Sequence, residues 1–191
     1  MQVSNDKIRE VLISKKYLTS DDIKKAEIAS KKAKLSIIDY IKYENLIPKD
    51  LLVEVVAEAM GVCCVNLNLK PPLPESVLAI PEGIARKYKL VVYKQDQKTV
   101  NIATDDPLDK ERLELVKKIF PLKDIIFCFA FPQDIELCFV NYRKALDTRF
   151  NKIIAKDGRI APEIIEEIIE DALSFHASDI HFEPQEKQVL I

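Results

Sequence analysis

The chain has 191 residues, of which 48% are hydrophobic and 31% charged, and its formal net charge is -2. This composition supports one or two domains with hydrophobic cores, and the near-neutral charge excludes a general affinity for nucleic acid, which needs a basic surface. Only three glycines occur, at positions 61, 83 and 158, so the chain contains neither a phosphate-binding P-loop nor a dinucleotide-binding glycine turn.

Residues 1–61 are predicted to form a module of four helices. Their hydrophobic residues recur at helical spacing, Thr19 offers an N-cap, and Pro48 and Gly61 mark the start and end of the fourth helix. The module also contains a weak repeat with an offset of 29 residues, in which Lys16 corresponds to Asn45. Two copies of a helix pair explain this repeat, although two unrelated amphipathic helix pairs can also align in this way. The matching hydrophobic positions are Ile8, Leu12, Leu18 and Ile23 in the first copy, and Ile37, Ile41, Ile47 and Leu52 in the second.

Residues 62–149 are predicted to form a small α/β lobe of the same N-terminal domain, with helices packed on a sheet. A proline-rich connector at residues 70–74 follows its first strand. The expected strands are 61–69, 90–95, 99–104 and 124–131, and the expected helices are 82–88, a segment from 107 to about 120, and 132 to about 149.

Residues 150–160 are expected to be a linker, because the charge changes sharply there. Residues 1–159 carry a net charge of +5, whereas residues 160–191 carry -7. Residues 161–191 are predicted to start a second α/β domain, with a helix at 162–175 and strands at 179–183 and 187–191. One helix and one hairpin cannot bury the isoleucine stripe of that helix, so we expect this domain to be incomplete and the chain to be part of a longer protein. The fold class is therefore α+β.

The cysteines and the apolar segments indicate the cellular compartment. Cys63, Cys64, Cys128 and Cys138 form no CxxC pair, and we interpret them as buried thiols of a protein in a reducing cytoplasm. No apolar run reaches the roughly 18–20 residues of a membrane span, and the N-terminus has no hydrophobic segment typical of a signal peptide.

The segment ASDIHFEP, at residues 177–184, is the most distinctive local pattern. On a strand, Asp179, His181 and Glu183 would share one face, and each would lie about 6.6–7 Å along the strand from the next. Such a ladder can bind a divalent metal or act as acid and base, which would make the chain a metal-dependent enzyme. The simpler interpretation is a hydrogen-bonded polar face, and we assign no metal ligands. His176 would then lie at the C-terminal end of a helix, where it interacts favourably with the helix dipole.

The same segment resembles the ASDIHIEP motif of the type II secretion and type IV pilus assembly ATPases, the GspE/PulE/PilB family. The resemblance extends upstream to Ala-Arg-Lys-Tyr at residues 85–88, Val-Asn-Ile-Ala-Thr-Asp-Asp-Pro-Leu-Asp at 100–109 and Phe-Pro-Gln-Asp-Ile at 131–135. It covers about the whole chain and identifies it as the N-terminal region of such an ATPase, ending before the P-loop core.

The resemblance implies that this region has a docking and regulatory role. It would tether a cytoplasmic motor, peripheral to the inner membrane, to the inner-membrane assembly platform protein or its cytoplasmic adaptor. ATP and magnesium are expected only in the missing core, which would form a homo-hexamer and drive assembly of pilin or pseudopilin subunits. We expect no cofactor, catalytic residue, nucleic acid partner or membrane span in residues 1–191. The motif implies that Ser178, Asp179, His181 and Glu183 position the junction with the core.

One branch of the family binds cyclic di-GMP through two copies of an RLGxxLxxxG motif, which would fall on the 29-residue repeat. The matching positions are Lys7, Ile8, Arg9, Leu12 and Lys16, and then Ser36, Ile37, Ile38, Ile41 and Asn45. Every glycine is lost, so side chains stand where the backbone would approach the ligand, and the second copy lacks its arginine. Lys7, Arg9, Leu12, Ile37 and Ile41 remain the candidates for such a site. A cyclic-dinucleotide sensor or a stand-alone adaptor is therefore the alternative function.

Overall fold

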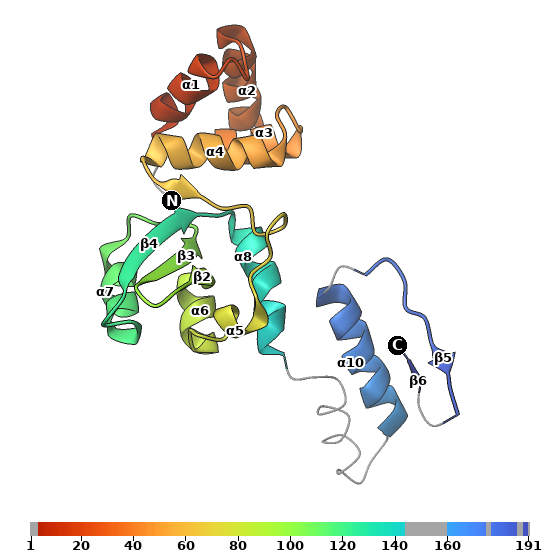
Figure 1. Ribbon diagram of the computed structural model, residues 1–191. Coiled ribbons are helices and arrows are strands. Elements are labelled where there is room, and N and C mark those ends of the chain that lie inside the picture. Colours follow the sequence, from red (N-terminus) through yellow and green to blue (C-terminus); the bar gives the residue numbers. More distant parts are fainter. Residues whose placement is uncertain (1–3, 144–159, 175–176, 187–188, 191) are drawn as a thin grey trace. The chain divides into compact units, whose positions relative to one another are not determined.

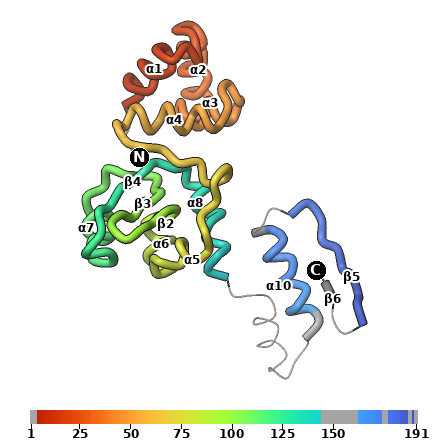
Figure 2. The backbone as a smooth tube through the Cα atoms, in the orientation of Figure 1, coloured from red at the N-terminus to blue at the C-terminus, as the bar shows by residue number. Residues whose placement is uncertain are grey.

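The computed structural model describes residues 4–143, 160–174, 177–186 and 189–190 (Figures 1 and 2). The chain divides into two compact units, Met1–Cys138 and Phe139–Ile191, which are described separately. The combination of helices and a small sheet confirms the α+β fold class. The predicted linker at 150–160 lies outside the described residues except for its last residue, so the predicted domain boundaries stay predictions.

Four helices open the first unit, as predicted: α1 (Asn5–Ser14), α2 (Ser20–Ala33), α3 (Ile37–Tyr43) and α4 (Lys49–Met60). The Thr19 hydroxyl accepts a 3.2 Å hydrogen bond from the Asp22 amide, and the Thr19 amide donates to the Asp22 carboxylate at 3.2 Å. These reciprocal bonds form a capping box at the start of α2. The pKa of Asp22 is lowered by the 2.6 Å hydrogen bond that the Thr19 hydroxyl donates to its carboxylate, and further by the one from the Thr19 amide. Gly61, with a φ of 72°, ends α4 in the left-handed conformation that glycine adopts without strain.

The two halves of the 29-residue repeat end their first helices in the same way. Lys16 and Asn45 both adopt left-handed backbone conformations, with φ values of 58° and 50°. In each copy the amide of the next residue donates a 3.0 Å hydrogen bond, to the Leu12 carbonyl in the first and to the Ile41 carbonyl in the second. The repeat is therefore present in the backbone as well as in the hydrophobic pattern.

A four-stranded sheet with helices around it forms the rest of the first unit. The elements are β1 (Cys63–Cys64), α5 (Pro74–Val77), α6 (Glu82–Tyr88), β2 (Leu90–Gln95), β3 (Thr99–Thr104), α7 (Lys110–Ile119), β4 (Asp124–Phe129) and α8 (Pro132–Cys138). The strand order is β1-β4-β3-β2, in which β2 and β3 are antiparallel and both other pairs are parallel. Figure 1 shows α7 on one side of the sheet and α8 on the other.

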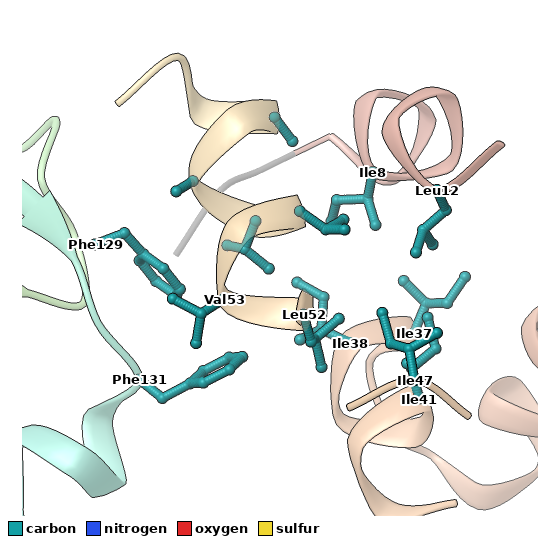
Figure 3. Packing of buried hydrophobic residues seen from close by; sticks show 14 of the residues in the cluster. Ile8, Leu12, Ile37, Ile38, Ile41, Ile47, Leu52, Val53, Phe129 and Phe131 are labelled. Carbon is teal, nitrogen blue, oxygen red and sulfur yellow. The ribbon is translucent and has the colours of Figure 1, made fainter. Parts of the chain in front are cut away.

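The hydrophobic core is continuous from the helices into the sheet (Figure 3). Helix α4 lies in the middle, with the side chains of α1 and α3 on one side and those at and just after the end of β4 on the other. Val53 of α4 faces Phe129 and Phe131, whose rings make an edge-to-face contact with centroids 5.4 Å apart. The buried cluster consists of Ile8, Leu12, Ile23, Ile37, Ile38, Ile41, Ile47, Leu52, Val53, Val55, Val56, Ala57, Ala59, Phe129 and Phe131.

Three predicted elements of this unit differ from the structure. The first strand, expected at 61–69, is limited to Cys63–Cys64, because the Asn66 side chain accepts hydrogen bonds from the amides of Asn68 and Leu69 and so turns the chain. Helix α5 begins within the segment that was expected to be an extended connector. The helix expected from 132 to 149 ends at Cys138 and is followed by a 3-10 helix, η1 (Phe139–Tyr142).

The interpretation of the cysteines as four buried thiols is wrong for three of them. Cys63 and Cys128 are in-register partners on β1 and β4, and they form a disulfide with a Cα–Cα distance of 4.6 Å. Cys64 is an exposed thiol, and Cys138 is a buried thiol outside any disulfide, whose pKa is raised to about 11 by burial. The sequence could not show the pairing, because the two bonded cysteines are 65 residues apart and their spacing matches no known cysteine motif.

In the second unit, besides η1, the structure describes α10 (Ile160–Ser174), β5 (Glu183–Pro184) and β6 (Val189–Leu190). The helix agrees with the prediction, but the strand expected at 179–183 is wrong, since β5 pairs with β6 over only two residues. Residues 179–182 have no regular structure, and the contacts of Asp179 are local side-chain contacts with Ser178 and His181. Among the described residues, no helix is both long and apolar enough to cross a membrane.

Replacing Lys16 with glycine should raise the free energy of unfolding by about 0.5–1 kcal/mol, because glycine adopts the left-handed conformation without the steric cost of a β-carbon. Glu10→Gly, an exposed position inside α1, should instead lower it by about 1 kcal/mol. Urea unfolding followed by circular dichroism measures both changes. A loss of stability in Lys16→Gly would contradict the observed helix end.

Reduction of the disulfide should lower the free energy of unfolding, since the bond closes a loop of 65 residues and this restricts the unfolded chain by about 4 kcal/mol in the chain-entropy model. The measurement is urea unfolding with and without a thiol reductant. The double variant Cys63→Ala/Cys128→Ala should not respond to the reductant. Equal responses of the variant and the parent chain would show that the disulfide does not contribute.

Candidate functional site: the junction between the helices and the sheet

A buried carboxylate connects the helical module to the rest of the first unit. Asp134 lies in the first turn of α8 and is only 3% exposed. It forms an ion pair with Lys49, at the start of α4, and accepts a 2.8 Å hydrogen bond from the side-chain amide of Asn68. Because a buried charge must be paired and hydrogen-bonded, this carboxylate holds together α4, the loop after β1 and α8.

A second lysine lies at the same junction. Lys42 of α3 donates a hydrogen bond to the side chain of Gln133, and its ammonium group is 5.1 Å from the centroid of the Phe131 ring. Burial lowers the pKa of Lys42, and the nearby positive charge of Lys49 lowers it further. Two cations from the helical module therefore meet the start of α8, where acceptors and an aromatic ring face them.

A small pocket of about 150 Å³ opens beside Lys42, between α3 and the start of α8. Its polar groups are already engaged in part, since the Ser36 hydroxyl donates a 2.6 Å hydrogen bond to Asp39 and caps α3. The lining combines one ammonium group with two carboxylates, so it presents no uniform charge to a ligand. The lining residues are Ser36, Ile38, Asp39, Lys42, Asp105, Phe131, Pro132 and Gln133.

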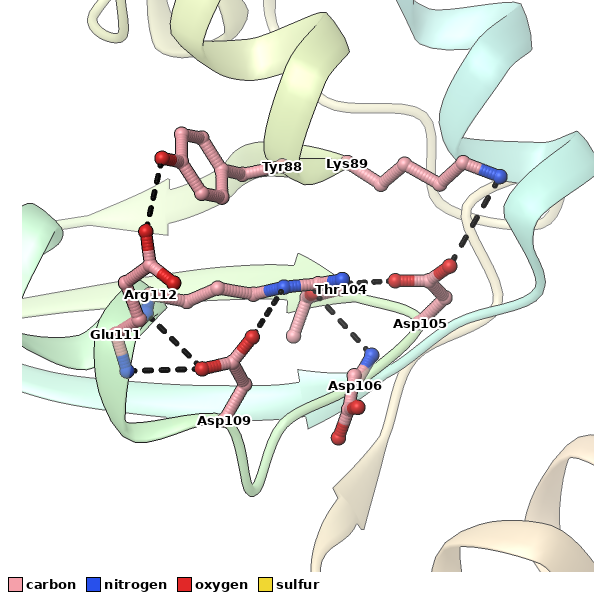
Figure 4. Close-up of polar contacts among 8 residues, drawn as sticks. All are labelled: Tyr88, Lys89, Thr104, Asp105, Asp106, Asp109, Glu111 and Arg112. Carbon is pink, nitrogen blue, oxygen red and sulfur yellow. Dashed lines mark hydrogen bonds and ion pairs between the residues drawn. The ribbon is translucent and has the colours of Figure 1, made fainter. Parts of the chain in front are cut away.

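A polar network around Arg112 connects the segments that carry the family resemblance (Figure 4). The Arg112 guanidinium donates a 2.6 Å hydrogen bond to the Thr104 hydroxyl, pairs with Asp105, and lies 3.3 Å from the Asp109 carboxylate. Asp109 also caps α7 by accepting a 2.8 Å hydrogen bond from the Glu111 amide. The acidic turn at residues 105–109 therefore fixes the start of α7 against the end of β3.

The same network reaches the helix that precedes β2. The Tyr88 hydroxyl donates a 3.1 Å hydrogen bond to Glu111. Lys89 lies 3.9 Å from a carboxylate oxygen of Asp105 and 3.5 Å from one of Glu136 on α8. The Ala-Arg-Lys-Tyr and Asp-Asp-Pro-Leu-Asp segments are thus linked through residues just beyond them, because Tyr88 contacts Glu111 and Asp105 contacts Lys89.

The candidate residues of the second unit are exposed. Ser178 and His181 both contact the Asp179 carboxylate, and these hydrogen bonds lower the pKa of Asp179, with Ser178 as the larger cause. Glu183 begins β5. Within the described part of the chain, no group of three or more histidine, cysteine or acidic side chains is arranged to hold a metal ion. A role of these four residues at a domain junction stays a prediction.

The candidates for a cyclic-dinucleotide site are divided between the core and the surface. Leu12, Ile37 and Ile41 are buried in the hydrophobic cluster, whereas Lys7 is exposed. Arg9 forms an ion pair with Glu27 of α2. The three apolar positions therefore support the packing of the helices, and a ligand role for all five candidates stays a prediction.

Comparison with known proteins gives one family and one fold. Residues 60–148 match the MshEN domain. A structure of MshE with cdg is 19% identical to the chain, covers 71% of it and 98% of its own chain, and has a TM-score of 0.54. A structure of the N-terminal domain of XpsE is 15% identical, covers 74% and 96% of the two chains, and has a TM-score of 0.46. The comparison with curated proteins finds no match.

These findings confirm the family resemblance that the sequence motifs indicated. Residues 60–148 carry an MshEN domain, in agreement with that resemblance, and the likeness to MshE shows a shared fold. The sequence analysis missed the junction residues Lys42, Lys49 and Asn68. Asp134 was part of a quoted motif, but nothing in the sequence signals that its carboxylate is buried.

Asp134→Ala should lower the free energy of unfolding by about 2–3 kcal/mol, because it leaves Lys49 and Asn68 without their acceptor in a buried setting. Glu136→Ala, an exposed position on the same helix, should change it by less than about 0.5 kcal/mol. Urea unfolding monitored by circular dichroism compares the two variants. Similar values for both would contradict the role assigned to Asp134.

Proposed function

From the MshEN domain at residues 60–148, we propose that this chain is the N-terminal docking and regulatory region of a secretion or pilus-assembly ATPase. In this proposal it tethers the motor to the inner-membrane assembly platform protein or to its cytoplasmic adaptor. The motor is a homo-hexamer in the cytoplasm, peripheral to the inner membrane. ATP and magnesium belong to its core and not to residues 1–191.

The construction of the first unit supports a docking role. The helical module and the sheet share one core, and the Lys49–Asp134 pair joins them, so they can move as one body. Thr104, Asp105 and Asp109 of one family segment all contact Arg112, so their polar side chains are already engaged. Such an arrangement suits a rigid platform for a protein partner better than a site for chemistry, because a reaction needs polar groups that are free to meet a substrate.

A second candidate is the binding of cyclic di-GMP. It is favoured by the matched structure of MshE with cdg and by the 29-residue repeat, whose two copies place Lys16 and Asn45 in the same left-handed turn. It is opposed by the loss of every motif glycine and by the Arg9–Glu27 ion pair, which engages the arginine that stands at one of the glycine positions. Docking is therefore the leading proposal.

Full-length ATPase should bind the cytoplasmic domain of its platform protein or adaptor in a saturable manner by titration calorimetry. Asp134→Ala should weaken this binding at temperatures where the first unit unfolds, while ATP hydrolysis by the core persists. Glu136→Ala should preserve both platform binding and ATP hydrolysis, and it serves as the control because it also removes a carboxylate from α8. Platform binding that survives unfolding of the first unit would overturn the proposal. Saturable binding of cyclic di-GMP with no platform binding would favour the second candidate.

A further inference from the structure

One face of α2 carries a regular basic stripe. Its four lysines, Lys24, Lys25, Lys31 and Lys32, stand three and four residues before and after Ile28. On a helix these spacings place all four beside Ile28 on one surface. The opposite face carries the buried residues of the helix, which are Ile23, Ala26 and Ser30. The basic stripe is therefore turned away from the core of the unit.

The centre of the stripe is apolar and open to solvent. Ile28 is 59% exposed, and Leu35, just beyond the end of α2, is 41% exposed. Leu35 is held in place because its amide donates a 3.0 Å hydrogen bond to the Ser30 carbonyl, and Lys34 takes the left-handed conformation that this helix end requires. Neither apolar side chain belongs to the buried cluster, so both can contact another surface without disturbing the fold.

The charges of the stripe are largely unneutralised. Lys24 lies 3.9 Å from Asp21, which is the limit of an ion pair, and its side chain remains 72% exposed. Lys25, Lys31 and Lys32 have no ion pair with any residue that the structure describes. The acidic residue nearest the buried side, Glu27, pairs with Arg9 of α1. The stripe thus presents four positive charges around one apolar side chain.

We propose that this face of α2 binds the surface of an anionic lipid bilayer. Lysines carry compact, flexible charges that suit a fluid layer of anionic headgroups, whereas recognition of a fixed carboxylate constellation favours the planar fork of arginine. Long lysine side chains can extend to the headgroups while Ile28 and Leu35 enter the interface between headgroups and acyl chains. The helix then lies in the plane of the membrane and does not cross it.

This inference is independent of the proposed protein partner, since it rests only on α2 and the two residues that follow it. It predicts a weak, reversible and salt-sensitive attachment, because a short helix with two apolar side chains buries little surface in lipid and relies on electrostatic attraction. Such an attachment would hold this face of the first unit against a membrane, whichever protein the unit also contacts.

The test is co-sedimentation of the chain with vesicles of phosphatidylcholine alone and with about one-third phosphatidylglycerol. The chain should bind the anionic vesicles at low salt and dissociate from them at high salt. It should not bind the neutral vesicles. Lys31→Glu/Lys32→Glu should weaken binding by roughly tenfold or more. Lys94→Glu/Lys98→Glu, which changes the same charge on the exposed β2–β3 hairpin, should weaken it far less.

The apolar contribution is tested with Ile28→Ser, which should weaken binding several-fold, against Leu122→Ser at a position that is 94% exposed. Circular dichroism confirms that each variant is folded. Absence of binding to anionic vesicles, or equal losses in the stripe and hairpin variants, would overturn the proposal. Binding to poly-glutamate that depends on Lys31 and Lys32, with no binding to vesicles, would overturn it in favour of an acidic protein partner.

Discussion

Helix α4 must be apolar on two sides, and the first unit depends on this constraint. Its Leu52 packs toward the other helices, while Val53 faces Phe129 and Phe131 beside the sheet. A helix that contacted only other helices on one side would need a single apolar stripe. Since α4 serves both sides, the helices and the sheet have one core between them. The Lys49–Asp134 pair adds a polar contact between the start of α4 and α8.

Features that follow from local periodicity could be predicted from the sequence, and features that depend on distant contacts could not. The isoleucine and leucine spacing predicted four helices, and the 29-residue offset predicted that Lys16 and Asn45 hold matching positions. The disulfide was missed because Cys63 and Cys128 meet only when β1 lies beside β4. The strand at 61–69 was overextended because the pattern of β-branched residues does not show that the Asn66 side chain competes for the backbone amides.

The candidate site shows a similar division. The motifs at 85–88, 100–109 and 131–135 were found from their residues, and they led to the right family. Their physical role was not visible in the sequence. Asp105 and Asp109 both pair with Arg112, which lies outside the quoted motifs. Burial of Asp134 depends on α4 and Asn68, which are far from it in the chain. In the most distinctive motif, at 177–184, the expected strand at 179–183 is wrong, because β5 includes only Glu183 and Pro184.

The double-sided character of α4 has a consequence for how such modules can be exchanged during evolution. A helical module transferred to another protein would carry Val53 and its neighbours as an uncovered apolar surface, unless the recipient supplied counterparts to Phe129 and Phe131. Recombination between relatives is therefore tolerated where both halves travel together, or where the break falls beyond Phe131. The shared core therefore ties the helices to the sheet, even though their secondary structures would suggest two separable pieces.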